Sequence, residues 1–317
     1  MSPALRAPLP GGRWHFQHGP IDIVIGVEGE PAAVAAALAA AWVRFETVLT
    51  ELVVELPLLR QPVMASRTDP AGAAANPLRG AIARRMWAAC APLRAEAQGF
   101  ITPMAAVAGA VAQELIDHFH RPGVQRAWVN NGGDIALHLA PGTLARVGLY
   151  ADLARFDADA AARTAAGTLR TDLDFVVHAA DPVRGVATSG WRGRSHSRGI
   201  ADSVTVLAAT AAMADAAATV IANAVNLVDE QQAARAGIVR LPANSQRDDS
   251  DLGTIAVTVN VPPLPAALVQ QALQRGLACA RRLQERGLLQ AALLVCQGSL
   301  VRLQAPMPLR SLPQLVQ

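Results

Sequence analysis

The chain has 317 residues, of which 52% are hydrophobic and only 17% are charged, against roughly 25% charged residues in an average domain. Its formal net charge is +3, and all 28 basic residues are arginine. The absence of lysine excludes Schiff-base chemistry, a lysine base and a P-loop, and the scarcity of aromatic rings argues against a nucleic-acid partner.

Three features bear on the compartment. The longest apolar stretch, residues 32–43, is shorter than the roughly 20 residues that cross a bilayer. The amino terminus, MSPALRAPLPGGRWHFQHG, has prolines and glycines where a secretory signal has its apolar segment. Three cysteines without CxxC pairing are typical of a reducing compartment. We expect a cytoplasmic protein with no membrane partner.

The first part of the chain predicts one strand followed by helices. Residues 21–27 alternate and are β-branched, which indicates a strand. Pro31 stands at the first turn of a predicted helix over 31–45, and a second helical stretch continues to about Val54. Residues 62–77 are predicted to be a loop. Two more helices are expected over 81–91 and 104–120.

The second part predicts mainly strands, separated by two further helices. The expected strands span 127–130, 135–139, 146–150, 174–178, 203–207 and 254–261, with a last pair over 293–303. Helices are expected over 210–227 and 266–286, and residues 244–251 are predicted to be a polar, mobile patch. Because strands and helices cluster without strict alternation, we expect an α+β fold of antiparallel sheets packed with helices. We expect one compound domain over residues 1–317.

Three clusters could carry chemistry. In NNGGD, residues 130–134, two glycines would let backbone N–H groups approach a ligand, although a plain hairpin turn is the stronger interpretation. Thr188, Ser189 and Gly190 precede Arg192, Arg194 and Arg198; this loop suits a phosphate or, equally, a solvated surface. In the same loop, His196 could be a general base.

Asp215 and Thr219 form the third cluster. They lie at i and i+4 of the helix predicted over 210–227, so both side chains project from one face. Both are hard oxygen ligands suited to Mg²⁺. From the residues alone, an acid near a helix start and a hydroxyl bonded to its own helix are the stronger interpretation.

In this order, the pieces resemble the ApbE-like superfamily, which includes the FAD:protein FMN transferases. The matching pieces are Ala105 to Gly109 within ITPMAAVAGAVAQ, NNGGD at 130–134, ATSG at 187–190, SVTV at 203–206 and ADAAAT at 214–219. The amino-acid sequences of several segments are more similar to an uncharacterised branch of this superfamily than to the transferases. The resemblance spans roughly residues 80–230.

The resemblance implies an ApbE-like, T-fold-like architecture with a flavin pocket between sheet and helices. In the transferases, Mg²⁺ bridges the FAD pyrophosphate and a threonine hydroxyl of a target protein attacks, releasing AMP. The resemblance implies that Asp215, Thr219 and a backbone carbonyl near Val107 are the metal ligands, and that His196 and Asp202 are catalytic. Residues expected to contact FAD or FMN are Thr102, Met104, Asn131, Gly132, Gly133, Asp134, Thr188, Ser189, Gly190, Arg194 and Ser203.

The chain also departs from the transferases. They usually carry a lysine-glycine pair and an aspartate in the segment that here reads VAGAVAQ, residues 107–113. From the resemblance as a whole, the expected function is a Mg²⁺-dependent transferase acting on FAD. The alternative is a non-catalytic flavin or pterin protein linked to tetrahydromethanopterin-dependent one-carbon metabolism, and a third interpretation is a subunit of a larger complex. The expected partners are a flavin or pterin, a target protein and further copies of the chain.

Overall fold

One antiparallel sheet organises the part of the chain that the structure describes. The structure is a computed structural model, and it describes residues 3–66, 74–149, 173–193 and 195–305. Nine strands within these ranges pair in the order β1-β2-β3-β4-β5-β8-β9-β12-β13. Their bounds are β1 Leu5–Leu9, β2 Arg13–His18, β3 Ile21–Gly29, β4 Val124–Asn131, β5 Asp134–Leu139, β8 Gly185–Ser189, β9 Ser203–Ala208, β12 Ala291–Cys296 and β13 Ser299–Leu303.

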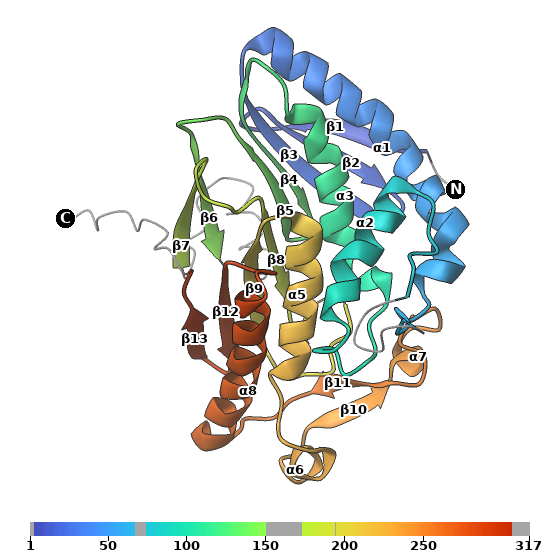
Figure 1. The fold of residues 1–317 in the computed structure, drawn as a ribbon, viewed down its shortest axis with the longest axis vertical. Helices are drawn as coiled ribbons and strands as arrows, with labels where there is room; N and C mark the ends of the chain where they lie inside the picture. The colour runs from blue at the N-terminus through green and yellow to red at the C-terminus, as the bar shows by residue number, and fades with distance from the viewer. Residues whose placement is uncertain (1–2, 67–73, 150–172, 194, 306–317) are drawn as a thin grey trace, which may run out of the picture.

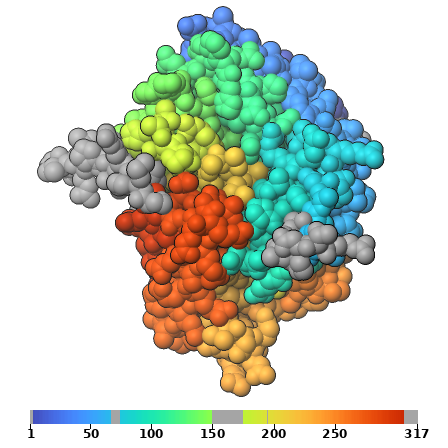
Figure 2. Space-filling model, viewed as in Figure 1, coloured from blue at the N-terminus to red at the C-terminus, as the bar shows by residue number. Residues whose placement is uncertain are grey.

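The longer helices lie in front of this sheet (Figure 1). They are α1 Pro31–Leu59, α2 Ala81–Cys90, α3 Val107–Ile116, α5 Ala211–Ala224 and α8 Ala266–Glu285. Figure 2 shows that little of α5, in yellow, reaches the surface between α8 and α2. Short helical turns are η1 Ala91–Leu93, η2 Pro103–Ala106, η3 Asp117–Phe119, α6 Glu230–Arg235 and α7 Ala243–Gln246.

Two smaller strand pairs complete the fold. β6 Leu144–Leu149 pairs with β7 Leu173–His178, and β10 Val239–Pro242 pairs with β11 Ala256–Asn260. The β6–β7 pair contributes Val147 and Val177 to a second apolar cluster, which also contains Val186 of β8 and Leu207 of β9. The central strands are thus covered on both faces, and all six residues of β9 are buried. This explains why β9 has an almost continuous run of β-branched and apolar residues.

The predicted fold class, α+β with antiparallel sheets and packed helices, is confirmed. The predicted hairpin around residues 130–134 and the helices over 81–91 and 266–286 are also confirmed. The helix predicted over 104–120 divides into η2, α3 and η3. Strands β1, β2, β8 and β10 were not predicted; in the predicted loop over 62–77, residues 67–73 lie outside the described residues, as does Tyr150 at the end of a predicted strand.

Helix α1 is longer than the sequence predicts. It runs unbroken through Pro57, where two helical stretches ending near Val54 were expected. Among the described helices it is long and apolar enough to cross a membrane by length and composition, which corrects the shorter estimate from residues 32–43. Its buried residues, which include Phe45 and Val48, pack in the main core. The core helix of a soluble protein can be equally long and apolar, so length and composition alone are weak evidence for a membrane span.

A carboxylate on α3 joins three helices. Glu114 accepts a hydrogen bond from Arg44 of α1 at 2.8 Å and another from Arg85 of α2 at 2.5 Å. Burial alone would raise the pKa of Glu114, but the hydrogen bonds from both arginines outweigh burial and lower the pKa below its ordinary value. The folded chain therefore stabilises the charged form of this side chain.

Replacing Glu114 by Gln should lower the free energy of unfolding at pH 7 by about 2 kcal/mol, because Arg44 and Arg85 lose their least exposed carboxylate partner and keep only Glu51 and Asp117. Its folded pKa is depressed, so the stabilisation is present above the unfolded value near pH ~4.3 and is lost as pH falls through the folded value. Urea unfolding of wild type and Glu114→Gln from pH 7 to pH 3 measures this difference.

Glu51→Gln is the matched control. Glu51 also bonds Arg44, but its side chain is 43% exposed against 14% for Glu114. We expect a loss of about 1 kcal/mol or less for this variant. Equal losses for the two variants, or a Glu114→Gln difference that does not shrink in acid, would contradict the role assigned to Glu114.

Candidate functional site

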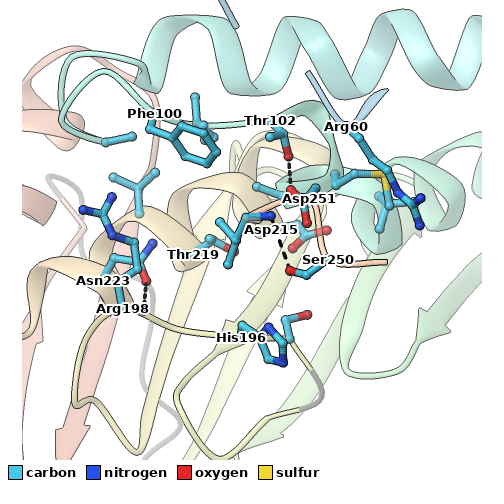
Figure 3. Close-up of a pocket in the computed structure, with 18 of the residues that line it drawn as sticks. Arg60, Phe100, Thr102, His196, Arg198, Asp215, Thr219, Asn223, Ser250 and Asp251 are labelled. Carbon is cyan, nitrogen blue, oxygen red and sulfur yellow. Dashed lines mark hydrogen bonds between the residues drawn. The ribbon is translucent and has the colours of Figure 1, made fainter. Parts of the chain in front are cut away.

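A cavity of about 290 Å³ lies where α5 meets three loops (Figure 3). Its size is at the lower end of the range for small-molecule pockets. It is lined by helix α5, the η2–α3 segment and loops 97–102, 195–198 and 247–252. Polar and charged lining residues are Arg60, Thr102, Asp134, Ser195, His196, Arg198, Asp215, Thr219, Asn223, Arg247, Asp249, Ser250 and Asp251.

Helix α5 presents its few polar side chains to this cavity. The helix begins after Thr210, whose hydroxyl accepts a hydrogen bond from the Met213 N–H at 3.3 Å. Most of its alanines are buried against neighbouring elements. Asp215, Thr219 and Asn223 follow at intervals of four residues, so they share one face, and all three line the cavity.

Asp215 belongs to α5, but its side chain reaches the N-terminal turn of α3. Its Oδ2 accepts a hydrogen bond from the Gly109 N–H at 2.9 Å. Burial raises the pKa of Asp215 well above its ordinary value, and the nearby charge of Asp134 raises it further, while backbone N–H groups of Gly109 and Ala108 act in the opposite direction. The two carboxylates therefore repel each other across one cavity, and a cation between them would offset that repulsion.

The NNGGD segment forms the tight turn between β4 and β5. Gly132 and Gly133 have positive φ angles of 67° and 116°, which suit glycine. Asn130 Oδ1 accepts from the Gly133 N–H at 2.8 Å, and Asn131 donates to the Ala108 carbonyl at 3.1 Å. Of this segment only Asp134 lines the cavity. Asn131, Gly132 and Gly133 shape the turn, so their predicted ligand contacts have no support from their position.

The residues predicted around strands β8 and β9 do not line the cavity, although the Thr188 N–H donates to Asp134 at 3.2 Å. Thr188 bonds Thr205 between the strands, with their hydroxyl oxygens 2.8 Å apart. A Cβ on Gly190 would stand 2.2 Å from the Asp202 carbonyl, so this glycine permits close chain packing. Ser189 and Ser203 belong to the same strand pair. Arg194 lies outside the described residues.

Asp202 occupies a structural position and does not line the cavity. Its carboxylate accepts hydrogen bonds from Trp191 Nε1 at 3.3 Å, Arg192 Nε at 3.4 Å and the Gln297 backbone N–H. The side chain is thus engaged by three donors and holds the loop after β8 to the end of β12. Its predicted catalytic role is not supported by this position.

Five other predicted residues do line the cavity: Thr102, Met104, Val107, His196 and Thr219. Burial lowers the pKa of His196 and Arg247 lowers it further, against an opposing effect of Asp251. The imidazole is therefore neutral at neutral pH and able to accept a proton.

Loop 247–252 contributes residues that the sequence analysis missed. Thr102 donates to Asp251, and Arg60 donates to Asp249 at 2.8 Å. These two contacts fix the loop beside the cavity. The sequence RDDSD at 247–251 was interpreted as a mobile surface patch, although five consecutive polar or charged side chains are also a signal for a binding loop. Arg60, Phe100 and Asn223 were also absent from the predicted site, whereas Arg198 had been named as part of a loop suited to a phosphate.

The side-chain oxygen atoms at the cavity meet only some of the requirements for binding a hard cation such as Mg²⁺. In the described ranges, no group of three or more His, Cys, Asp or Glu side chains is arranged to hold a metal ion. Asp134, Asp215 and the Thr219 hydroxyl nevertheless offer oxygen atoms to one cavity. Mg²⁺ in proteins commonly uses one or two carboxylates and keeps several waters, so these residues are sufficient in kind.

The family of the chain follows from comparison with known proteins. The family model described as AbpE bacteria matches residues 6–302. The chain therefore belongs to this ApbE-like family, as the resemblance in the sequence indicated.

The relatives and solved structures show how far this similarity reaches. A UPF0280 protein of Methanothermobacter thermautotrophicus is 38% identical over 46% of this chain and 52% of that protein, and one from Methanocaldococcus jannaschii is 35% identical over 42% and 48%. The chain spans about half the length of the curated relatives it matches. The flavinyl transferase ApbE of Pseudomonas stutzeri matches over 96% of this chain and 94% of its own, at 16% identity and a TM-score of 0.43.

Substituting Gly109 by Ala should disrupt the site from within. A Cβ at this position would stand 2.3 Å from the Ala211 carbonyl oxygen and 2.8 Å from Asp215 Cβ. The added methyl would push α3 and α5 apart. We expect a loss of about 2 to 3 kcal/mol in thermal or urea unfolding, despite the higher helix propensity of alanine.

Gly80→Ala serves as the comparison for this variant. A Cβ on Gly80 would be 3.7 Å from its nearest neighbour, an ordinary contact. Its cost should be about 1 kcal/mol or less, arising from the helix start alone. A Gly109→Ala protein as stable as wild type would show that α3 and α5 do not depend on this close approach.

Proposed function

We propose that the protein is a Mg²⁺-dependent transferase that acts on FAD and transfers its FMN portion to a hydroxyl group of a target protein. The observation that carries this proposal is the meeting of Asp134, Asp215 and Thr219 at one cavity beside the N-terminus of α3. Membership of the ApbE-like family supports it. In addition, the name of the Pseudomonas stutzeri protein describes a flavinyl transferase.

Asp134, Asp215 and Thr219 would hold the metal ion, together with a backbone carbonyl near Val107. When bound, Mg²⁺ supplies charge neutralisation for the pyrophosphate and for the leaving group. The backbone N–H groups at the start of α3 orient the Asp215 carboxylate toward the cavity. The protein's own contribution to this chemistry is therefore mainly positioning.

The transfer exchanges one phosphorus–oxygen bond for another. The target hydroxyl oxygen forms a bond to the phosphorus of the FMN portion. The bond from that phosphorus to the bridging oxygen breaks, and AMP leaves with the electron pair. His196 lines the cavity with a pKa lowered first by burial, so it is placed to accept the hydroxyl proton.

A second function is favoured by two observations. The segment 107–113 lacks the charged groups usual in the transferases, and a volume near 290 Å³ is small for a whole dinucleotide. Both suit non-catalytic binding of a flavin or pterin, in the setting of tetrahydromethanopterin-dependent one-carbon metabolism. In either case we propose a cytoplasmic, single-domain protein that assembles with copies of itself.

Incubation of the purified chain with FAD, Mg²⁺ and hydroxyl-bearing candidate targets should release AMP, measured by chromatography. Asp215→Ala should reduce the rate at least roughly 100-fold, because the variant loses a carboxylate metal ligand and leaves Asp134 as the remaining one. Mg²⁺ should also raise the melting temperature of wild type and leave that of Asp215→Ala unchanged.

Asp22→Asn is the control for these measurements. Asp22 is half exposed on β3, bonds His15 at 2.9 Å and is not among the cavity residues. Its AMP release and Mg²⁺ response should match wild type. Binding of flavin without AMP release from any target would favour the non-catalytic function, and unchanged turnover in Asp215→Ala would remove that residue from the site.

A further inference from the structure

Arg198 lies at the end of the cavity away from Asp215. Along α5, Asp215 and Asn223 are eight residues apart, which corresponds to about 12 Å along the helix axis. Arg198 lines the cavity beside Asn223 (Figure 3). The other cationic lining residues, Arg60 and Arg247, have carboxylate neighbours in Asp249 and Asp251 of loop 247–252. Arg198 is therefore the lining cation that stands apart from these acids.

The Arg198 guanidinium has no carboxylate in ion-pairing contact within the described part of the chain. Its Nη2 donates to the neutral Gln98 Oε1 at 3.4 Å. The nearby carboxylate of Glu230 is engaged by Arg240 at 2.5 Å. Burial lowers the pKa of Arg198, and the charge of Arg240 lowers it further. A partly buried cation in these surroundings lacks the counter-charge that such groups normally have.

The backbone around Arg198 is firmly held. Its N–H donates to Asn223 Oδ1 at 2.8 Å, and its carbonyl accepts from Asn226 Nδ2 at 3.0 Å. Ser197 also donates to Asn223 Oδ1 at 3.1 Å. A Cβ on Gly199 would stand 2.0 Å from the Ala222 carbonyl oxygen, so the loop packs directly on the end of α5. The guanidinium is therefore presented from a fixed backbone, as a binding group requires.

We propose that Arg198 binds a phosphate or carboxylate group of the ligand whose other end lies at Asp134 and Asp215. The inference rests on the proposed function for its ligand class and adds a second recognition point. An arginine offers a planar, bidentate donor pair to such an anion. For a dinucleotide ligand, the metal at Asp134 and Asp215 and the Arg198 guanidinium would then both act on its phosphate groups.

FMN and riboflavin provide a matched pair of probes, because they differ in one terminal phosphate. Their dissociation constants should be measured by fluorescence titration of the full chain in EDTA. Without a divalent cation, Asp134 and Asp215 repel a phosphate, so a preference for FMN that depends on Arg198 reports binding of the phosphate by its guanidinium group. Wild type should prefer FMN by roughly 10- to 100-fold.

In Arg198→Gln the preference for FMN should fall to about twofold or less, while riboflavin affinity stays within about twofold of wild type. Arg198→Lys should retain an intermediate preference, since lysine keeps the charge and loses the bidentate geometry. Arg192→Gln is the control: Arg192 belongs to the same loop region but bonds Asp202 and does not line the cavity. The Arg192→Gln variant should prefer FMN over riboflavin as strongly as wild type does.

Inorganic pyrophosphate in EDTA is the second probe and needs no flavin. At about ten times its dissociation constant it should raise the melting temperature of wild type and Arg192→Gln by roughly 2 to 4 °C, but not that of Arg198→Gln. No shift in wild type, or equal shifts and equal FMN preference in Arg198→Gln, would overturn the inference. An Arg198-dependent shift without AMP release from FAD would instead overturn only the proposed transfer.

Discussion

The close approach of α5 to α3 and β8 is the constraint on which the site depends. It is made by the smallest side chains: a Cβ on Gly109 would stand 2.3 Å from the Ala211 carbonyl oxygen, and one on Gly185 would stand 2.2 Å from Thr210. At this separation the carboxylate of Asp215 reaches the Gly109 N–H. Larger side chains would separate the helices and leave the acid without its backbone donor. The alanine content of the chain therefore has a structural reason in addition to any bias of composition.

Several charged groups of the site lie along α5, and they raise the free energy of the protein without a ligand. Asp134 and Asp215 raise each other's energy at one end, while Arg198 lacks a counter-charge at the other. Both are unfavourable in the free protein, and both are relieved by a ligand with matching charge. Two helical turns separate Asp215 from Asn223, beside which Arg198 lies, so Arg198 does not neutralise the acid. The cavity is thus better matched to a polar, bifunctional ligand than to an apolar one.

Local patterns in the sequence predicted much of the fold. The helix predicted over 210–227 corresponds to α5, and Asp215 and Thr219 at i and i+4 predicted its polar face. The glycines of NNGGD defined a hairpin, and the structure confirms it. By contrast, Thr188, Ser189 and Ser203 resembled ligand groups but bond within the sheet, which only strand pairing reveals. Arg60 and Asp249 are 189 residues apart and meet through tertiary packing, so no local pattern could bring them together.

Segment 107–113 shows how the site differs from that of the transferases. The transferases usually carry a lysine-glycine pair and an aspartate within this segment. Here Ala110, Val111 and Ala112 are fully buried, whereas Val107 and Ala108 line the cavity. Gln113 accepts a hydrogen bond from the Ala212 N–H at 3.3 Å, so it joins α3 to the start of α5. The buried part of the segment is therefore used for packing, and a charged group at positions 110–112 would be buried without a partner. The additional charge at the cavity comes instead from loops 195–198 and 247–252, which can change without disturbing the helix contact.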